Sequence, residues 1–411
     1  MKINEIILNA EKELQPIYEE LERVALVNQD KVLRAFQEHN IALRHFVGTT
    51  GYGYGDEGKE ALCKVYASCF GAEDAIVSEN LISCGSHAIK IALYGLLRPN
   101  DLMLSITGKP YDTMDETIFG LPDVDNGSLK DFGVKYKQID LLEDSCFDFD
   151  KIIESVKNDN PKIVYIQRSR GYSLRNGIEI KKIKEVVEVI RKYNTKAKIV
   201  VDNCYCEFVE EQEPTAVGAN VIIGSLIKNP GAGLVSCGGY IAGDHDCIDI
   251  IATSLTSSSL KQEVGCSERG YRLLYQGIFM SPHTVLQAMK GSYLITAVME
   301  KLGYKVLPGV DNKVSDIVRT IFFDKKQDLI DFCKVIQSMS PVDSFVSPEP
   351  CLMSGYDSEV IMSAGCFVEG ASIELSCDSP LVEPYALYIQ GGLTYEHIKL
   401  AINEFVNKKM Q

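Results

Sequence analysis

The sequence lacks any uninterrupted apolar stretch that approaches the roughly 18–20 residues of a membrane-spanning helix. It also lacks a run of lysine and arginine dense enough to attract a nucleic acid. Its 42 Lys and Arg residues are outnumbered by 57 Asp and Glu residues, which gives a formal net charge of −15. Because this charge repels a polyphosphate backbone, we expect neither a nucleic acid nor a membrane as partner.

Paired C-x-x-C motifs of the kind that bind zinc are also missing. The 13 cysteines are odd in number and too dilute for a disulfide scaffold, and the closest pair is the C-x-C of Cys204 and Cys206. We therefore expect buried thiols, no metal site and a reducing compartment. The first 20 residues carry acids among their apolar positions and no small-residue cleavage site, so we expect no signal peptide and a cytoplasmic location.

The sequence has the composition of a soluble globular chain, with 45% hydrophobic and 24% charged residues. Its 411 residues allow two to four domains. From about residue 70, short apolar runs alternate with segments of helical period, which predicts an α/β fold with a large, mostly parallel sheet covered by helices on both faces. The expected buried strands are 74–78, 101–106, 134–139, 162–167, 198–202, 220–224 and 238–243, and the expected helices are 89–97, 150–157 and 180–193.

Two changes of pattern divide the chain into three parts. Residues 1–60 are predicted as an N-terminal helical arm, helical over 3–40 with a break at Pro16, and an interface loop. Residues 61–300 form the large α/β domain. Residues 301–411 form a smaller C-terminal α+β domain, with strands expected at 317–323 and 371–377 and helices at 328–339 and 394–406.

The residues that follow each strand are informative because ligands of open α/β sheets lie at the carboxyl ends of the strands. Gly85, Ser86 and His87 come just before the helix that follows the first strand. A glycine and a serine at a helix start present backbone N–H groups and a hydroxyl to an anion. An ordinary helix cap is the alternative interpretation.

Asp202 ends one predicted strand, and Lys228 follows the next one, with Ser225 three residues before it. Pyridoxal 5′-phosphate needs such a set: a lysine for the Schiff base, a carboxylate that holds the pyridine nitrogen protonated, and several donors for the phosphate. Tyr111 lies in GKPYDTMDE after another strand, where it can stack on the ring or donate a proton. Burial and a cationic cofactor should lower the pKa of Lys228 from about 10.4.

At these positions the sequence resembles a known family. The segments CGSHAIKIAL, GKPYDTMDE, QRSRGYSLR, VVDNCYCEF, GSLIKNPGAGL and YIQGGLTYEH are similar to those of the methionine gamma-lyase-related, or aluminium-resistance-related, proteins. These belong to the cystathionine-metabolising enzymes of pyridoxal-phosphate fold type I. The resemblance covers about residues 45 to 405 and implies a carbon–sulfur lyase that acts by β- or γ-elimination on a sulfur amino acid.

The resemblance also implies roles for single residues. It makes Lys228 the Schiff-base lysine and Asp202 the partner of the pyridine nitrogen, with Tyr111 over the ring. It assigns the phosphate to Gly85, Ser86, His87 and Ser225. It places Tyr52 and Tyr54 in a segment that reaches the neighbouring subunit's site, so we expect a homodimer or homotetramer with shared sites.

Two positions depart from the family pattern. Ile227 stands where relatives carry a hydroxyl residue that contacts the phosphate, and Val382 stands where relatives carry the arginine that binds the substrate carboxylate. We expect Arg170 or Arg175 to replace that arginine, since both follow the 162–167 strand. Arg175 as a distant structural residue, and Arg170 as a contact of the cofactor's phenolic oxygen, are the alternatives.

Further alternatives remain at this stage. Arg168, Arg170 and Arg175 together form either a salt-bridged structure or an anion site, and the acidic segment 209–213 is predicted as a solvated loop. The G-x-G-x-x-G spacing at 53–58 follows a helix rather than a strand, which argues against a dinucleotide site. For the function, the rivals of elimination are transamination, aldol cleavage and a binding or tolerance protein without turnover.

Overall fold

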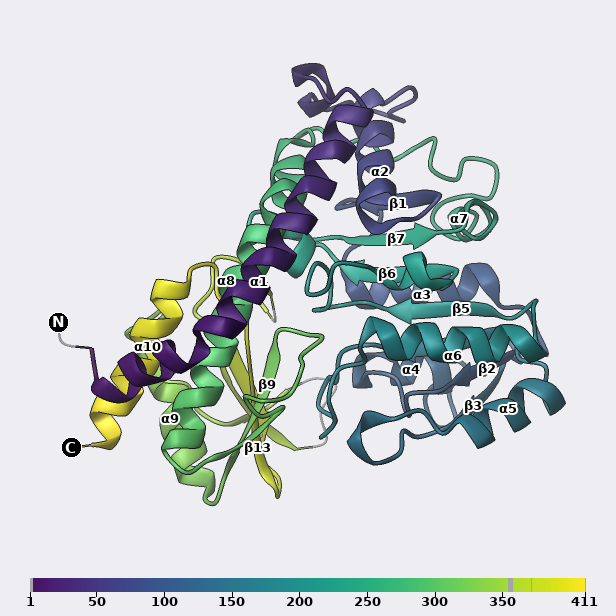
Figure 1. Ribbon diagram of the computed structural model, residues 1–411. Helices are drawn as coiled ribbons and strands as arrows, with labels where there is room; N and C mark the ends of the chain where they lie inside the picture. Colours follow the sequence, from purple (N-terminus) through teal and green to yellow (C-terminus); the bar gives the residue numbers. More distant parts are fainter. Residues whose placement is uncertain (1–2, 354–357, 371, 411) are drawn as a thin grey trace.

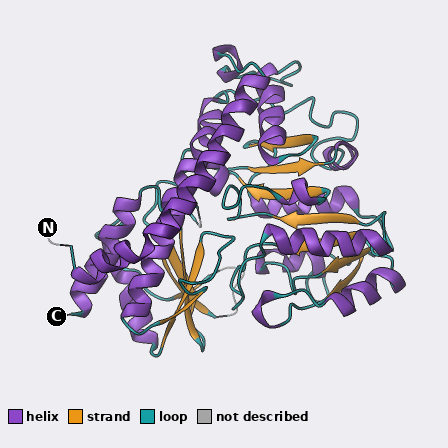
Figure 2. Cartoon of the chain, in the orientation of Figure 1, coloured by secondary structure: helices purple, strands orange, loops and turns teal. Residues whose placement is uncertain are grey.

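The computed structural model describes residues 3–353, 358–370 and 372–410. It contains two separate β-sheets, and helices α1 (Glu5–Glu38) and α8 (Arg272–Lys301) run side by side from the first sheet to the second (Figure 1). The cartoon in Figure 2 shows the strands of the two sheets apart from each other, with loops between them. The predicted α/β fold class is confirmed.

The larger sheet has seven strands in the order β1-β7-β6-β5-β4-β2-β3. Strands β2 to β6 pair in parallel, whereas β7 is antiparallel to both of its neighbours. The edge strand β3 is largely exposed, so the expected buried strand at 134–139 is wrong in this respect: a sheet edge alternating lysine with tyrosine faces solvent. The strands are β1 (Asp74–Ser78), β2 (Leu102–Ser105), β3 (Lys135–Gln138), β4 (Ile163–Gln167), β5 (Lys198–Asp202), β6 (Val221–Ser225) and β7 (Gly239–Gly243).

Helices cover both faces of this sheet because alternate strand residues point to opposite sides. Val164 and Ile166 belong to the core beneath one set of helices, and Ile163 and Tyr165 to the core beneath the other. The first set is α2 (Glu57–Phe70), α5 (Phe149–Asn158) and α6 (Ile180–Tyr193), and the second is α3 (Gly85–Leu96), α4 (Asp115–Phe119) and α7 (His245–Ala252). The helix expected at 180–193 is confirmed with the same bounds.

The smaller sheet is antiparallel, with six strands in the order β10-β11-β12-β13-β9-β8. Helix α9 (Lys326–Ser338) packs on it, and α10 (Tyr395–Lys409) packs on α9 and α8. The strands are β8 (Lys305–Leu307), β9 (Val318–Phe323), β10 (Cys351–Leu352), β11 (Glu359–Ser363), β12 (Ser376–Pro380) and β13 (Tyr385–Gln390).

The strand expected at 371–377 is placed differently, because β12 begins only at Ser376. Ala371 lies outside the described residues. The Glu374 carboxylate accepts hydrogen bonds from the backbone N–H groups of Phe367 (2.9 Å) and Val368 (2.8 Å). These bonds hold the segment before Ser376 against a neighbouring loop instead of a strand.

Helix α1 continues through Pro16, so the break expected there is wrong. Proline removes one intrahelical hydrogen bond, but Leu14 and Tyr18 on either side of it are buried. The Tyr18 hydroxyl also donates to the Lys290 carbonyl oxygen of α8 at 3.3 Å. Packing against α8 therefore stabilises a helix that the local sequence alone would interrupt.

Within the described ranges, none of the helices combines the length and apolar character needed to cross a bilayer. All 13 cysteines are free thiols. Seven of them are buried, as expected, but Cys84, Cys146 and Cys351 are exposed. Among the described residues, no group of three His, Cys, Asp or Glu side chains is arranged to hold a metal ion.

Candidate active site

A cavity lies between the carboxyl ends of β4, β5 and β6 and the smaller sheet. The last residues of these three strands, Gln167, Asp202 and Ser225, line it from the larger sheet. The side chains that line it from the smaller sheet are Val318, Asp378, Tyr388 and Gln390. Because the carboxyl ends of parallel strands are where α/β proteins bind ligands, this cavity is the candidate active site.

Lys228 reaches this cavity from the turn that follows β6. Its Nζ lies 4.0 Å from the centroid of the Tyr205 ring. Burial lowers the pKa of Lys228, but the acidic groups around it, led by Cys204, Tyr205 and Asp202, outweigh burial and raise the pKa. Without the cofactor, the protein therefore does not lower the pKa of Lys228 as the sequence led us to expect.

Asp202 is buried on the same wall as Lys228, because β5 and β6 are parallel neighbours that end at the same edge. One of its oxygens accepts a hydrogen bond from the Cys204 backbone N–H at 3.1 Å. The sequence-based expectation that Asp202 and Lys228 meet agrees with this placement.

The start of α3 forms a cradle at the side of the cavity. Cys84 is its N-cap, and no side chain of the described residues caps the helix. A Cβ atom on Gly85 would lie 3.1 Å from Cβ of Ser225 and 3.5 Å from Sγ of Cys204, so a larger residue would fill the cradle. The Ser86 hydroxyl lies 2.8 Å from that of Thr113. Unpaired helix N–H groups beside several hydroxyls fit a phosphate dianion.

His87 differs from its two neighbours in the predicted cradle. Its ring Nδ1 accepts a hydrogen bond from the Ser83 backbone N–H at 3.2 Å, and burial lowers the pKa of the ring. The described lining of the cavity does not include His87. Its place in the first turn of α3 puts its backbone N–H, like those of Gly85 and Ser86, at the start of the helix.

Tyr111 lines the cavity, where the sequence places it. Its ring centroid lies 6.1 Å from that of Tyr172. Gly171 has a φ of +56°, and a Cβ atom there would lie 3.0 Å from Cδ2 of Tyr111. The glycine therefore provides both a left-handed backbone and the space in which the Tyr111 ring packs.

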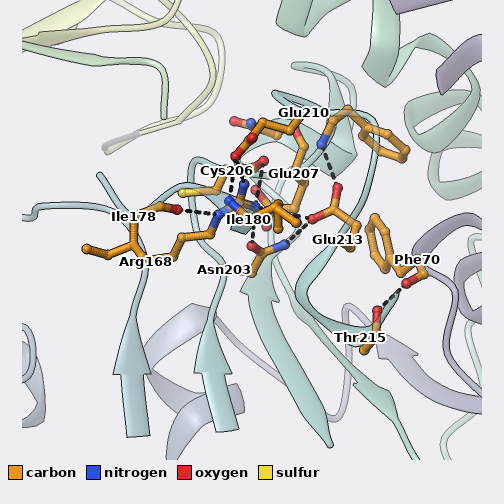
Figure 3. A network of polar contacts seen from close by, with 12 residues as sticks. Phe70, Arg168, Ile178, Ile180, Asn203, Cys206, Glu207, Glu210, Glu213 and Thr215 are labelled. Atoms are coloured by element: carbon orange, nitrogen blue, oxygen red, sulfur yellow. Dashed lines mark hydrogen bonds and ion pairs between the residues drawn. The ribbon is translucent and has the colours of Figure 1, made fainter. Parts of the chain in front are cut away.

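Arg168 belongs to a buried network behind the cavity and not to an anion site (Figure 3). Its guanidinium donates to Glu210 at 2.7 Å, to Asn203 at 2.9 Å and to Glu213 at 3.4 Å. Glu213 is only 2% exposed. The solvated loop predicted for 209–213 is thus wrong, because two of its acids neutralise a buried arginine and hold the loop that follows Asp202.

Arg170 and Arg175 do not line the cavity among the described residues. Arg170 is fully buried and pairs with Asp316 at 3.3 Å and with the Leu307 carbonyl at 2.7 Å. Arg175 donates to the carbonyl oxygens of Ser169 at 2.7 Å and Gln167 at 2.8 Å. Neither guanidinium therefore lies where a carboxylate anchor was expected among the described lining residues, because the terminal nitrogens of Arg170 bind Leu307 and Asp316 and those of Arg175 bind carbonyl oxygens of the loop after β4.

Val382 lies in the turn between β12 and β13 and is 49% exposed. It is not among the described residues of the cavity wall. The missing arginine at this position therefore leaves no gap in the wall. The same hairpin reaches the cavity instead through Asp378, Tyr388 and Gln390.

Sequence reasoning missed Tyr205, Asp378 and Gln390. Tyr205 has a φ of +68°, and its hydroxyl accepts a hydrogen bond from the Gln390 side chain at 3.1 Å. A hydroxyl and an amide from different sheets thus meet across the cavity. Two features of the sequence could have pointed to these three residues. One is the polar segment after β5, and the other is the alternation of polar positions along β12 and β13.

Ile227 lines the cavity, and its carbonyl oxygen accepts a hydrogen bond from the Ile373 backbone N–H at 3.2 Å. It therefore links the loop that carries Lys228 to the segment before β12 of the smaller sheet.

Tyr52 and Tyr54 are 65% and 60% exposed, and their rings stack with centroids 5.4 Å apart. Since neither is among the described residues of its own chain's cavity, their role in a neighbouring subunit stays a prediction.

The chain matches one known protein family over almost its whole length. The family model described as methionine gamma-lyase matches residues 3–410. The chain belongs to the methionine gamma-lyase family. The resemblance inferred from the sequence motifs is therefore confirmed.

Solved structures of this family have the same fold. A Listeria innocua protein, named as a candidate cystathionine beta-lyase involved in aluminum resistance, is 44% identical with a TM-score of 0.95 and 98% of each chain covered. A carbon-sulfur lyase involved in aluminum resistance from Clostridium novyi NT is 43% identical with a TM-score of 0.94, and 99% of this chain and 96% of that chain are covered.

A more distant structure supports the fold class. The pyridoxal-5′-phosphate-dependent protein YhfS from Escherichia coli is 17% identical with a TM-score of 0.64, over 95% of this chain and 97% of that one. At this identity the similarity concerns the fold alone. The methionine gamma-lyase family member described here therefore has the architecture of fold-type-I pyridoxal-phosphate proteins.

Proposed function

We propose that this chain is a pyridoxal-phosphate-dependent carbon–sulfur lyase that eliminates a thiol from a sulfur amino acid such as methionine or cystathionine. The observation that carries the proposal is the meeting of Lys228, Asp202 and the uncapped start of α3 in one cavity. A lysine, a carboxylate and an anion-binding helix start are the three groups that this cofactor requires. The family relationship supports the same conclusion.

Each group then has a defined task. When bound, pyridoxal phosphate supplies a ring that accepts the electron pair left on the substrate's α-carbon. Lys228 would hold the cofactor through Nζ and would act as the base that removes the substrate's α-proton. Asp202 would keep the pyridine nitrogen protonated. Tyr111 would pack over the ring, and either Tyr111 or Lys228 would give a proton to the leaving sulfur.

Borohydride reduction tests the first of these tasks. We expect the purified protein to be yellow, to lose this colour on reduction, and to carry the cofactor covalently on Lys228. Lys228→Ala should show no such label by mass spectrometry. If the variant is labelled as strongly as the natural chain, Lys228 does not carry the cofactor.

Product analysis tests the reaction. Elimination releases a thiol, ammonia and a 2-keto acid from methionine or cystathionine, and Asp202→Asn should keep some cofactor yet lose most of this turnover. A keto acid without a thiol would indicate transamination, and an aldehyde would indicate aldol cleavage. Bound cofactor without any product would indicate a binding protein.

A further inference from the structure

The cavity wall carries a second carboxyl group that the proposed reaction does not use. Asp378, on β12, lines the cavity from the smaller sheet, whereas Lys228 and Asp202 line it from the larger one. A substrate between the cofactor and the smaller sheet would meet Asp378 and its neighbours Tyr388 and Gln390. This inference rests on the proposed function, because it assumes that Lys228 and Asp202 hold the cofactor.

Tyrosine rings surround Asp378. Tyr172 donates a hydrogen bond to its carboxylate, and burial raises the pKa of Asp378 to about 7. The rings of Tyr172 and Tyr388 lie 4.9 Å apart, measured between centroids. The hydroxyl of Tyr388 donates to the Tyr172 carbonyl at 2.5 Å, which fixes both rings beside the carboxyl group.

The charged side chains that line the cavity indicate which group of a substrate Asp378 can bind. Among the described lining residues, Lys228 is the basic side chain, and Asp202 and Asp378 are the two acids. The cofactor uses Lys228 and Asp202, so the charged group left for the substrate is an acid. A carboxylate beside aromatic faces attracts a cation, since both a charge-assisted hydrogen bond and the ring faces favour an ammonium group.

We propose that Asp378 binds a second ammonium group of the substrate, located on the part of the molecule that leaves as the thiol. The preferred substrate class is then a thioether amino acid with an amino group at both ends. Methionine, which has a single amino group, belongs to the disfavoured class. Asp378 is a specificity-determining residue in this assignment and takes no part in the elimination itself.

A pair of matched ligands tests the proposal. L-Cystathionine and S-(3-carboxypropyl)-L-cysteine differ only in the distal amino group. Dissociation constants are measured by calorimetry at pH 8 on cofactor-loaded Lys228→Ala protein, which cannot turn the ligands over. We expect cystathionine to bind about tenfold more tightly, a ratio that corresponds to roughly 1.4 kcal/mol.

Adding Asp378→Asn should bring the two dissociation constants to within about twofold of each other. Glu383→Gln is the matched control, since it removes a carboxylate from the exposed turn of the same hairpin and should preserve the tenfold ratio. Equal binding of the two ligands without the Asp378 change would overturn the proposal. A tenfold ratio that survives Asp378→Asn would overturn it as well.

A second measurement needs no change at Asp378 and applies even if that variant does not fold. Lowering the pH from 8 to 6 should reduce the ratio from about tenfold to about twofold as Asp378 gains a proton. The titratable groups that face it are Tyr172, Tyr205 and Tyr388, and burial raises the pKa of Tyr205 and Tyr388 to about 12. Cys377, the residue before Asp378 in β12, points to the opposite face of the sheet, toward Cys333 of α9. A ratio that does not change with pH contradicts the proposal.

The turnover of the natural chain separates this inference from the proposed function. Thiol release from both ligands with equal binding would leave the lyase intact and remove the ammonium site. A tenfold binding preference without thiol release would leave the ammonium site intact and remove the lyase.

Discussion

At the scale of single residues, Glu207 is a carboxyl group buried in the protein interior. It is fully buried, and one of its oxygens accepts a hydrogen bond from Tyr240 at 2.9 Å. The other oxygen has no hydrogen-bond partner among the described residues. Burial raises the pKa of Glu207 to about 8, so the folded chain holds its proton where the unfolded chain has lost it.

This proton makes stability depend on pH in a defined direction. As pH rises from about 4.5 to 8, the unfolded chain gains stability relative to the folded chain through this group, so the protein loses stability. Glu207→Gln removes the titration. In urea unfolding, we expect the variant's free energy of unfolding to improve relative to the natural chain by about 1–3 kcal/mol between pH 5.5 and pH 8.5.

The control for the Glu207 experiment is Glu188→Gln, which removes an exposed carboxylate from α6. Its difference from the natural chain should stay constant over the same pH range. A constant difference for Glu207→Gln would contradict the assignment of a raised pKa.

Gly171 gives a second prediction at this scale. Gly171→Ala places a Cβ atom 3.0 Å from the Tyr111 ring in a left-handed backbone and should move that ring. We expect cofactor affinity, measured by absorbance titration, to fall about tenfold. Gly303→Ala is the matched control: its φ is +88°, but no atom of the described ranges lies within 4 Å of the added Cβ. Equal affinities in the two variants would mean that Tyr111 does not contribute to cofactor binding.

At the scale of elements, the loop between β5 and β6 depends on one arginine. Arg168→Met would leave the buried carboxylate of Glu213 without its charge partner, and such a loss costs about 3–5 kcal/mol. We expect a loss of this size in urea unfolding at pH 7. Replacing Glu213 by Gln in the same chain should recover part of it, because the uncompensated charge is then removed.

Arg23→Met is the control, since Arg23 pairs with Glu211 of the same loop at 2.5 Å but is half exposed. An exposed pair contributes about 0–1 kcal/mol. If the two arginine variants lose the same stability, burial does not decide the strength of the Arg168 contacts.

The elements also show what the sequence could predict. Helix α6 was found with correct bounds because its apolar residues recur at helical spacing on one face. Helix α8 was missed, because it is buried over most of its surface and contains Pro282, so it shows neither a clean period nor an uninterrupted propensity. The strand before Cys377 was misplaced because Glu374 binds the backbone N–H groups of Phe367 and Val368 in the preceding loop, and the apolar pattern of 371–377 does not reveal these hydrogen bonds.

The same limit applies to the site. Lys228, Asp202 and Gly85 lie at or after the carboxyl ends of β6, β5 and β1, which run in the same direction in one sheet, so their place along the strands brings them to one edge. Asp378 and Gln390 reach the cavity from the other sheet, and only the packing of the two sheets places them there. Arg170 and Arg175 follow a strand as well, but their terminal guanidinium nitrogens bind backbone carbonyls and Asp316.

At the scale of the whole molecule, apolar side chains remain on the outer surface of the N-terminal region. Leu26 and Leu33 of α1 are 70% and 43% exposed, and Leu43 and Val47 in the following loop are 81% and 67% exposed. Because this patch adjoins the exposed Tyr52–Tyr54 pair in sequence, we propose that it is the surface through which two copies associate.

Hybrid subunits test the shared site. Lys228→Ala and Tyr54→Phe should each reduce turnover, and mixing the two proteins should restore activity to about a quarter of the natural level by forming some sites with both natural residues. Subunit exchange is verified by native mass spectrometry. Exchange without restored activity would show that Tyr54 does not act across the interface.

The contact between the two ends of the chain has a consequence for synthesis. Glu11 of α1 pairs with Lys399 of α10 at 2.7 Å, and the buried face of α1 packs along α8. A ribosome makes about 5–20 residues each second, so α1 waits tens of seconds before residue 272 and its partner helix exist. During that time Ile7, Leu14 and Val32 lack the α8 surface that buries them in the folded chain, so the first helix to be made is among the last to reach its native packing.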